Sequence, residues 1–475
     1  MRTRPPGPKG VPLFGSSRRY ARDPFEFLTA CGEAYGDVVR FDLGPVGTYM
    51  LTNPADVERV LVTDAASYRK PSFISAIGDL LGHGLLMSDG ETWRRQRDLA
   101  GPAFRMQRIA SLVDMMADRA ASAVAEWGDG EVRDVHDEMA RLTVRIVVEA
   151  MFGTSMSDER IRTVQENLEP LGRRFEPDPF RVVVPDWAPT RENVEYRRSI
   201  GVLEGIIDDM VEERRGTEYG RGAGGDARGG NEADPGGGAS GVTGVGDPAA
   251  TGDDEPMDLL SILLRARDRG EQTDRQLRDE LMTMLLAGHD TTALALTYAW
   301  RLLADHPEAA ARLRAEVDEV LGDRRPTMAD LRELTYTERV LLESMRLYPP
   351  VYVMFREPKV DVKLGGYRVP ADSAVMLPQW VIHRSPRYWD DPESFDPDRF
   401  SPERSADRPR YAYFPFGAGP RHCIGKQFSV AEAKVIVATV ARAYDLDRAE
   451  DRPLRLRGSL TMHPRDPVRM RLRAR

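Results

Sequence analysis

The sequence is poor in cysteine and in lysine, and it contains no long apolar run. Its 475 residues include two cysteines, Cys31 and Cys423, which stand near opposite ends of the chain. Neither a zinc site built from paired cysteines nor a disulfide framework is therefore the natural interpretation. No run of about 18 apolar residues suggests a membrane span, and the N-terminus lacks the apolar core of a secretory signal. We therefore expect a cytoplasmic protein without an integral membrane segment.

The balance of charge argues against a nucleic-acid partner. Asp and Glu number 76 against 67 Lys and Arg, which gives a formal net charge of −9. Proteins that bind a phosphate backbone draw their affinity from clustered cations. Only six of the basic residues are lysines, so arginine carries almost all of the positive charge. We expect no nucleic acid among the partners of this protein.

Apolar periodicity predicts a mainly α fold with a smaller β region. Apolar residues recur at a spacing of three or four after residue 90, as they do in amphipathic helices. The predicted helices there cover residues 90–104, 108–127, 135–152, 157–175 and 191–215. The first ~70 residues instead mix short β-like runs at 37–43 and 48–52 with a predicted helix over 54–62, which has proline in its first turn. Length alone does not decide the domain count, and we expect one domain over residues 1–475.

Residues 216–256 interrupt this pattern. They consist largely of Gly, Ala, Asp and Ser, with almost no large apolar residue. Such a segment cannot bury enough surface to order itself. We expect a flexible loop inside the domain, acting as a solvated tether, with docking of a partner or adaptation to salt as the less favoured alternatives.

Cys423 stands in an unusual run, Phe416-Gly-Ala-Gly-Pro-Arg-His-Cys-Ile-Gly425, just before a proline-free segment over 424–444 that predicts a helix. Unpaired amides and the helix dipole at a helix N-terminus favour a thiolate. The glycines of the run let the backbone turn tightly and approach a flat ligand closely, and Arg421 places a cation two residues before the sulfur. A buried, unreactive cysteine is the alternative, but it would need neither the glycines nor the arginine.

A long predicted helix over 273–306 carries a second unusual segment, Ala287-Gly-His-Asp-Thr-Thr292. Glycine and hydrogen-bonding side chains weaken the interior of a buried helix, so this segment needs another reason to be there. Thr291 can donate to a carbonyl one turn back and open a groove, and Asp290 can relay protons from outside. Considered alone, the segment is equally compatible with a helix kink or a second helix capped by Asp290.

The run around Cys423 resembles the haem-binding loop of the cytochrome P450 family. The family pattern is Phe-x-x-Gly-x-Arg-x-Cys-x-Gly, and its fixed positions are filled here by Phe416, Gly419, Arg421, Cys423 and Gly425. The resemblance implies the cytochrome P450 fold, with haem b held between the long central helix and the helix after the cysteine loop. It also implies that Cys423 is the axial ligand of the haem iron.

The central helix segment is similar to the oxygen-binding groove of the same family. The family pattern is Ala/Gly-Gly-x-Asp/Glu-Thr-Thr/Ser, and it is matched at each fixed position by Ala287, Gly288, Asp290, Thr291 and Thr292. By this resemblance Ala287 and Gly288 lie over the haem, while Asp290 and Thr291 steer protons to the distal oxygen. A haem-based sensor or carrier, the binding-module alternative, would explain Cys423 but not this helix.

Two further segments imply a charged network. Glu343 and Arg346 stand three residues apart on a predicted helix over 336–348, where most such pairs are solvated and contribute little. Residues 395–400 match the family's loop that brings in a second arginine, here Arg399. The resemblance implies that these three residues form a buried network that serves the scaffold and haem loading.

The resemblance also assigns cations to the haem propionates. Trp93 and Arg97, spaced i and i+4 on a predicted helix, match the family's Trp-x-x-x-Arg pair. Arg356, in a strand-like run over 351–356, and Arg421 complete the set, and arginine suits forked contacts with carboxylates. An exposed arginine-rich helix is the alternative for this segment. His422 is interpreted as structural.

Membership of the family would make the protein a monooxygenase that inserts one atom of O2 into a C–H bond. Two electrons must come from a separate ferredoxin or flavodoxin with its reductase, because no Gly-x-Gly-x-x-Gly turn and no residue span for a flavin or iron-sulfur domain is found. We expect this carrier to dock on the face around Cys423, where Arg421 and Lys426 lie. A peroxygenase that uses hydrogen peroxide is the alternative enzyme, although its known members replace the acid-alcohol pair that is intact here.

By analogy with the family, the substrate pocket is expected to be largely apolar. Its predicted walls are the central helix and residues 72–86, 175–184, 351–355 and 459–462. Such walls favour a lipophilic small molecule, for example a fatty acid, a terpenoid or a steroid-like compound. We expect the protein to act as a monomer.

Overall fold

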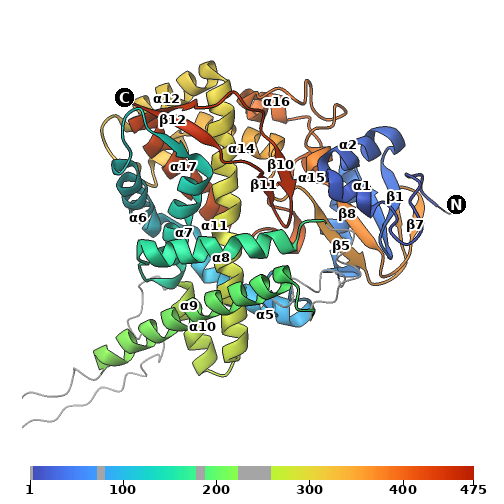
Figure 1. Ribbon diagram of the computed structural model, residues 1–475, viewed down its shortest axis with the longest axis horizontal. Coiled ribbons are helices and arrows are strands. Elements are labelled where there is room, and N and C mark those ends of the chain that lie inside the picture. The colour runs from blue at the N-terminus through green and yellow to red at the C-terminus, as the bar shows by residue number, and fades with distance from the viewer. Residues whose placement is uncertain (1–3, 72–80, 178–187, 223–257) are drawn as a thin grey trace, which may run out of the picture.

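The computed structural model describes residues 4–71, 81–177, 188–222 and 258–475. Helices make up most of these residues, and a small β region lies beside the first two helices (Figure 1). The predicted mainly α fold with a smaller β region is therefore confirmed. Residues 72–80 and 178–184 of the predicted pocket walls lie outside the described residues, so their contribution to a pocket stays a prediction.

The helices follow the apolar periodicity, and capping residues set many of their ends. Asp134, for example, accepts the amide of His136 at 3.0 Å where α7 begins. The α-helices are α1 (Ser17–Arg22), α2 (Pro24–Tyr35), α3 (Pro54–Glu58), α5 (Gly90–Ala100), α6 (Met106–Ala125), α7 (Val135–Phe152), α8 (Asp158–Arg174), α9 (Arg191–Gly222), α10 (Leu259–Asp268), α11 (Asp274–Asp305), α12 (Pro307–Leu321), α13 (Asp330–Glu333), α14 (Thr335–Leu347), α15 (Gln379–Ile382), α16 (Pro402–Ser405) and α17 (Lys426–Ala443).

Several predicted boundaries differ from the structure. The helix predicted over 54–62 is α3 followed by a π-helical turn, Arg59–Thr63. Helix α9 continues to Gly222, whereas the loop was expected to begin at residue 216, because the helical hydrogen-bond ladder extends past the last apolar position. The rest of the predicted loop, from 223 onward, lies outside the described residues, and its flexibility stays a prediction.

The β region is built from short strands. They are β1 (Val38–Leu43), β2 (Val46–Leu51), β3 (Tyr68–Arg69), β4 (Val132–Asp134), β5 (Met354–Pro358), β6 (Val362–Leu364), β7 (Tyr367–Val369), β8 (Ala374–Leu377), β9 (Tyr444–Arg448), β10 (Leu456–Gly458), β11 (Met462–Pro464) and β12 (Arg469–Ala474). The largest sheet has the order β1-β2-β8-β5-β3. Strands β1 and β2 pair antiparallel, with Val38 opposite Leu51, and β8 joins β2 in parallel. The β10–β11 hairpin pairs Gly458 with Met462.

Helix α11 passes through the body of the molecule and contacts α7, α9, α14 and α17 (Figure 1). It begins with a capping box, in which the side chains of Thr273 and Gln276 each accept the other's backbone amide. Most of its side chains are buried. This helix therefore forms the axis around which the motifs of the sequence are arranged.

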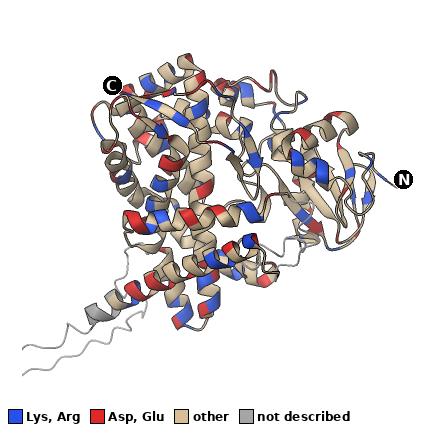
Figure 2. Cartoon of the chain, viewed as in Figure 1, with Lys and Arg blue, Asp and Glu red and all other residues tan. Residues whose placement is uncertain are grey.

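Charges of both signs are interspersed over the helices, and α9 shows this mixture along its length (Figure 2). Within the described residues, no helix combines the length and the apolar character that crossing a membrane requires. The cytoplasmic location expected from the sequence stays a prediction.

Candidate active site

The Cys423 loop is a series of tight turns that leads into α17. The amide of Cys423 donates to the carbonyl of Phe416 at 2.9 Å. A short 3₁₀ turn, Gly419–Arg421, precedes the cysteine, and Gly425 is the N-cap of α17. The thiol therefore stands at the N-terminal end of a helix, as the sequence predicts.

Desolvation controls the protonation of this thiol. It raises the pKa of Cys423, although the Gly425 amide, Arg97 and Lys426 act in the opposite direction. The helix N-terminus alone therefore does not produce the thiolate that the sequence suggested. The proton would leave if a metal cation bound the sulfur, because a coordinating thiol is deprotonated. Although the surrounding protein desolvates the group, the side chain is exposed at its surface, so a ligand can reach it.

Gly419 is required by a close approach of the backbone. Its φ is 67°, and a Cβ atom at this position would lie 1.8 Å from the carbonyl oxygen of Leu61 in the π-helical turn. Any side chain would collide with that carbonyl in a conformation that already disfavours L-residues. The loop therefore packs directly against the turn Arg59–Thr63. This contact explains why the motif requires glycine at position 419.

Helix α11 presents an open face at its central segment. Ala287 is exposed and Thr291 is half-buried, whereas residues 292–300 are buried. The Thr291 hydroxyl donates to the Ala287 carbonyl at 3.1 Å, which is the bond to the preceding turn expected from the sequence. On another side of the helix, a Cβ on Gly288 would lie 3.2 Å from the methyl groups of Val147. Gly288 therefore allows α7 to pack closely against α11.

Asp290 is held by the β10–β11 hairpin. The Thr461 hydroxyl donates to its Oδ2 at 2.7 Å, and His463 Nε2 lies 3.4 Å from the same oxygen. Burial acts to raise the pKa of Asp290, but His463, His289 and the Thr461 hydroxyl outweigh it and hold the pKa well below its usual value. Asp290 is therefore a carboxylate at neutral pH, with its position fixed by Thr461.

The second threonine of the motif connects α11 to α17. Thr292 Oγ1 and Ser429 Oγ share a hydrogen bond of 2.9 Å. Below it, the fully buried Glu432 has a pKa well above its usual value, because burial desolvates the carboxyl while Thr292 only partly offsets this. Thr292 adjoins Thr291, and Ser429 lies on α17, the helix that follows Cys423. This bond therefore brings the two motifs of the sequence to one place.

Three cations converge beside the loop with one carboxylate among them. Arg421 is paired with Asp89 and donates to the Ser88 carbonyl at 2.8 Å. Burial first, and then the charge of Arg421, lowers the pKa of Arg356 to about 10. Burial, Arg356 and Arg421 also lower the pKa of Lys70 well below its usual value. Cations that depress one another's pKa in this way form a site for an anionic group.

Trp93 and Arg97 lie at the edge of the same cluster. The guanidinium carbon of Arg421 is 4.5 Å from the centre of the Trp93 ring, and that of Arg97 is 5.8 Å from it. Arg97 donates to the His422 carbonyl at 3.0 Å and contacts the His422 ring. His422 thus serves a structural role within this loop, as interpreted from the sequence.

Arg421, one of the two cations expected at the docking face of an electron carrier, points inward, and the docking face itself stays a prediction. The Arg421 side chain is 15% exposed and is turned inward onto Asp89 and Trp93. Lys426 is exposed at the start of α17. The motif arginine therefore belongs to the anion site, and of the two cations named for docking only Lys426 is presented at the surface.

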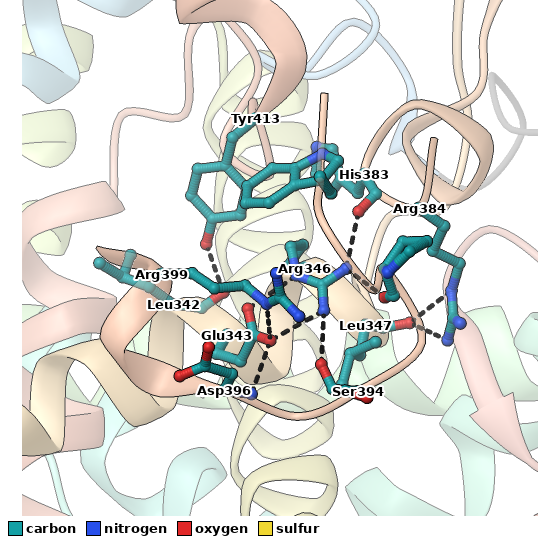
Figure 3. Close-up of polar contacts among 12 residues, drawn as sticks. Leu342, Glu343, Arg346, Leu347, His383, Arg384, Ser394, Asp396, Arg399 and Tyr413 are labelled. Carbon is teal, nitrogen blue, oxygen red and sulfur yellow. Dashed lines mark hydrogen bonds and ion pairs between the residues drawn. The ribbon is translucent and has the colours of Figure 1, made fainter. Parts of the chain in front are cut away.

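Glu343, Arg346 and Arg399 lie together in one buried network (Figure 3). Arg346 donates to both oxygens of Glu343, at 2.7 and 2.8 Å, and neither side chain is exposed. The remaining donors of Arg346 reach the carbonyls of His383, Pro392 and Ser394 at 2.6–3.1 Å. Arg399 Nε lies 3.3 Å from Glu343 Oε1. The network fixes α14 to the segment that precedes the cysteine loop.

Three residues of the site had no signal in the sequence analysis. Lys70 belongs to the cation cluster, and Thr461 and His463 hold Asp290. Residues 459–462 were expected only as an apolar pocket wall. The contact partners Thr461 and Asp290 are 171 positions apart, so no local pattern links them, and only the rarity of lysine in this chain could have drawn attention to Lys70.

Comparison with known proteins identifies the architecture. A family model described as Cytochrome P450 matches residues 5–470. The chain belongs to the cytochrome P450 family. The resemblance stated from the motifs is thereby confirmed, and the protein is an oxidoreductase of the monooxygenase class, since that is the activity of the family.

Among the relatives of this cytochrome P450 are three bacterial proteins of similar length. Cyclooctatin synthase of Streptomyces melanosporofaciens is 34% identical over 98% of this chain and 94% of its own. Cyclooctat-9-en-7-ol 5-monooxygenase of the same organism is 33% identical over 92% and 88%. Pentalenene oxygenase of Streptomyces avermitilis is 30% identical over 98% and 97%.

The family implies a haem-thiolate cofactor, and the residues present fit it. Cys423 offers a sulfur ligand that is accessible from outside the chain. The buried cluster of Arg356, Arg421 and Lys70 carries more positive charge than Asp89 can balance, as two propionate groups require. The open face of α11 at Ala287 leaves room on a helix that is otherwise largely buried.

Proposed function

We propose that this cytochrome P450 hydroxylates a cyclic, terpene-like lipophilic molecule with O2, using haem b and electrons from a ferredoxin or flavodoxin system. The observation that carries the reaction is the Thr292–Ser429 hydrogen bond of 2.9 Å. It joins the proposed proton-handling segment of α11 to α17, the helix that begins just after the Cys423 loop. The choice of substrate rests on two relatives, one named for the 5-monooxygenation of cyclooctat-9-en-7-ol and one for the oxygenation of pentalenene.

In this proposal Cys423 ligates the iron, and Trp93, Arg97, Arg356, Arg421 and Lys70 hold the propionates. When bound, haem supplies activation of O2 and transfer of an oxygen atom to carbon, and the thiolate favours cleavage of the O–O bond. The protein's own part is to place charge and protons. The cations would neutralise the propionates, and the small, exposed Ala287 would let α11 approach the ring, whereas Gly288 faces Val147 of α7.

Thr291 and Asp290 would hold and move protons at the open face of α11, where O2 would be activated. The Thr291 hydroxyl, anchored on the Ala287 carbonyl, keeps an oxygen lone pair free to accept a hydrogen bond on the open face of α11. Asp290 stands next to it in the sequence and is ionised at neutral pH. It can accept a proton from one side and release it toward Thr291 on the other. Loss of either group would let reduced oxygen leave as peroxide.

The first test is the spectrum of the reduced, carbon-monoxide-bound protein. A strongly red-shifted absorption band is expected in the wild type and is lost in Cys423→Ala, whereas Cys31→Ala, which removes the other cysteine, keeps it. Retention of the band in Cys423→Ala would refute the sulfur ligand. A screen of cyclic terpenes, fatty acids and steroids for a change in spin state then tests the substrate class.

The second test separates this reaction from its alternatives. Product formation that requires O2, reductant and both carrier proteins supports a monooxygenase. Turnover with hydrogen peroxide alone would instead indicate a peroxygenase, and reversible ligand binding without turnover would indicate a sensor or carrier. Asp290→Asn is compared with the wild type in each assay. It should lower the product formed with O2, reductant and carriers, because it removes the acid that the monooxygenase reaction needs.

A further inference from the structure

Three of the seven histidines of the chain surround Asp290, and one of them belongs to a connected chain of polar groups. His463 Nε2 lies 2.9 Å from Thr461 Oγ1, and Thr461 Oγ1 lies 2.7 Å from Asp290 Oδ2. We propose that Thr461 and His463 form a hydrogen-bonded wire that resupplies Asp290 with protons. This inference rests on the proposed role of Asp290 in proton delivery, and it assigns a role to two residues of the β10–β11 hairpin.

The direction of the hydrogen bonds follows from counting donors. A carboxylate has no proton to give, so the hydroxyl proton of Thr461 points to Asp290. The Thr461 oxygen must then accept from its other neighbour, which makes His463 Nε2 a donor. The order is therefore His463 Nε2–H to Thr461 Oγ1–H to Asp290 Oδ2, and every member is satisfied.

A proton moves along this order without any change in the number of bonds. The hydroxyl proton of Thr461 passes to Asp290 Oδ2, and Thr461 Oγ1 takes the Nε2 proton of a His463 imidazolium, which becomes the neutral ring with its proton on Nδ1. The imidazole then regains a proton from solvent, since its side chain is 14% exposed. Asp290 needs such a supply, because a carboxylate with a strongly lowered pKa holds a proton only briefly.

The two histidines beside the wire do not take up the proton that it carries. His289 on α11 donates to the Leu285 carbonyl at 2.7 Å, and burial lowers its pKa. His136 on α7 packs its ring 5.7 Å from that of His463, and burial together with His463 lowers the pKa of His136 to about 4. Both neighbours are therefore neutral at pH 7 and do not compete for the proton.

Two charged residues complete these surroundings. Arg457 lies opposite His463 in the backbone pairing of β10 with β11. Its guanidinium forms an ion pair with Glu176 at 3.0 Å. The charge of Asp137 on α7 acts to raise the pKa of His136, against the larger effect of burial. The only carboxylate that His463 contacts in the described residues is Asp290, so the wire has one acidic end.

The hydroxyl of Thr461 is not needed to build the hairpin. The turn is closed by the Thr461 carbonyl, which accepts the amide of Ser459 at 2.9 Å and its hydroxyl at 3.1 Å. Thr461 is 7% exposed, so a valine of the same shape fills the space. The side-chain oxygen is therefore free to serve the wire.

The experiment compares Thr461→Val, which breaks the wire, with Thr461→Ser, which keeps the hydroxyl. With holoenzyme, substrate, O2 and the electron carriers, we expect Thr461→Val to lower product per O2 by about ten-fold and to raise peroxide release, with a changed solvent isotope effect. Thr461→Ser should stay within about two-fold of the wild type. His463→Gln should resemble Thr461→Val. Thr439→Val, another buried threonine whose hydroxyl donates to Val435 at 2.8 Å, is the matched control.

A second readout does not depend on turnover. The lowered pKa of Asp290 stabilises the fold above its unfolded pKa, and this contribution is lost as the pH falls through the folded pKa. The loss of melting temperature in Thr461→Val and His463→Gln should therefore be largest near pH 6 and shrink toward pH 3. A purely structural defect would be the same at both pH values.

The outcomes separate the two proposals. If Asp290→Asn turns over like the wild type, the proposed role of Asp290 fails and the wire with it. If Asp290→Asn is impaired while Thr461→Val and Thr461→Ser behave alike in product yield and isotope effect, the wire alone is refuted. A deficit in melting temperature that does not change with pH would also refute it.

Discussion

Buried ionisable side chains occur in this protein in two states. Some have a partner of opposite charge, as Glu343 has in Arg346 and Arg399. Others lie in surroundings that favour their neutral form, as Glu432 does. Both arrangements avoid an isolated buried charge, which is costly. The two states respond differently to substitution, and this difference can be measured.

Glu280 is a carboxyl of the second kind. It is 1% exposed on α11, accepts the amide of Leu85 at 3.1 Å, and burial raises its pKa to about 7. Since its ordinary value is 4.5, the folded state takes up a proton, and stability falls as the pH rises from about 4.5 through about 7. The cost above pH 7 is about 3 kcal/mol.

We expect Glu280→Gln to remove this pH dependence. The amide oxygen can still accept the Leu85 N–H, but the side chain never ionises. Relative to the wild type, the variant should therefore gain melting temperature between pH 5 and pH 8. Thermal unfolding of holoenzyme at both pH values measures this gain. Glu271→Gln, at an exposed carboxylate paired with Arg269, should show no such gain, and an equal shift in both variants would contradict the argument.

Arg346 shows the behaviour of a paired charge. Replacing it by lysine keeps the charge but loses the fork that binds both oxygens of Glu343. It also leaves carbonyls of His383, Pro392 and Ser394 without donors. We expect Arg346→Lys to lower the free energy of unfolding by about 3–5 kcal/mol, measured by denaturant titration. Arg368→Lys, at an exposed pair with Asp361, should change it by less than about 1 kcal/mol.

At the scale of elements, the cysteine loop depends on the π-helical turn Arg59–Thr63. Gly419 lies so close to the Leu61 carbonyl that no side chain fits. The turn and the loop are far apart in the sequence, yet each defines the shape of the other. A substitution at this contact should therefore act on haem binding as well as on stability.

We expect Gly419→Ala to destabilise the protein by about 2 kcal/mol or more, because the residue has a positive φ and would collide with a carbonyl. Haem content per chain should fall with it. Gly205→Ala is the matched control, since this glycine lies on the exposed side of α9 with nothing within 4 Å of a new Cβ. That change should stabilise by roughly 0.5–1 kcal/mol. Equal effects of the two substitutions would contradict this account.

Elements whose apolar periodicity is strong could be predicted from the sequence, and contacts between distant elements could not. Helices α6, α7 and α11 lie close to their predicted bounds. Helix α2 was missed although Asp23 caps it, accepting the amides of Phe25 and Glu26 at 3.0 Å, because an aspartate before a proline also suits a turn. The Cys423 loop and the α11 segment were found since each motif is continuous. Thr461 joins Asp290 only through the fold.

At the scale of the whole molecule, segments from three regions bring positive charge to one place, and a fourth adds an aromatic ring. Lys70 follows β3, Arg356 lies in β5, Arg421 precedes Cys423, and Trp93 on α5 packs against Arg421. Without an anion these cations repel one another, and burial adds to the cost. Binding haem should therefore stabilise the folded chain beyond the contribution of the iron-sulfur bond alone.

Lys70 allows this idea to be tested. Its pKa is well below the usual value of 10.5, with burial as the first cause and Arg356 and Arg421 next. Folding then releases a proton, and the lysine costs stability at every pH below about 10. Lys70→Met should raise the melting temperature of the haem-free protein. In the holoenzyme the same change would remove a proposed partner of a propionate.

The increase in melting temperature on adding haem should therefore be smaller in Lys70→Met than in the wild type. Ligand binding stabilises a protein by about 4 kcal/mol when the ligand is at ~1,000 times its Kd, so a change in affinity is visible as a shift in melting. Lys363→Met, at an exposed lysine in β6, should leave both melting temperatures unchanged. If Lys70→Met destabilises the haem-free protein, or leaves the effect of haem intact, then Lys70 is not part of the anion site, and the charge of that site comes from Arg356 and Arg421 alone.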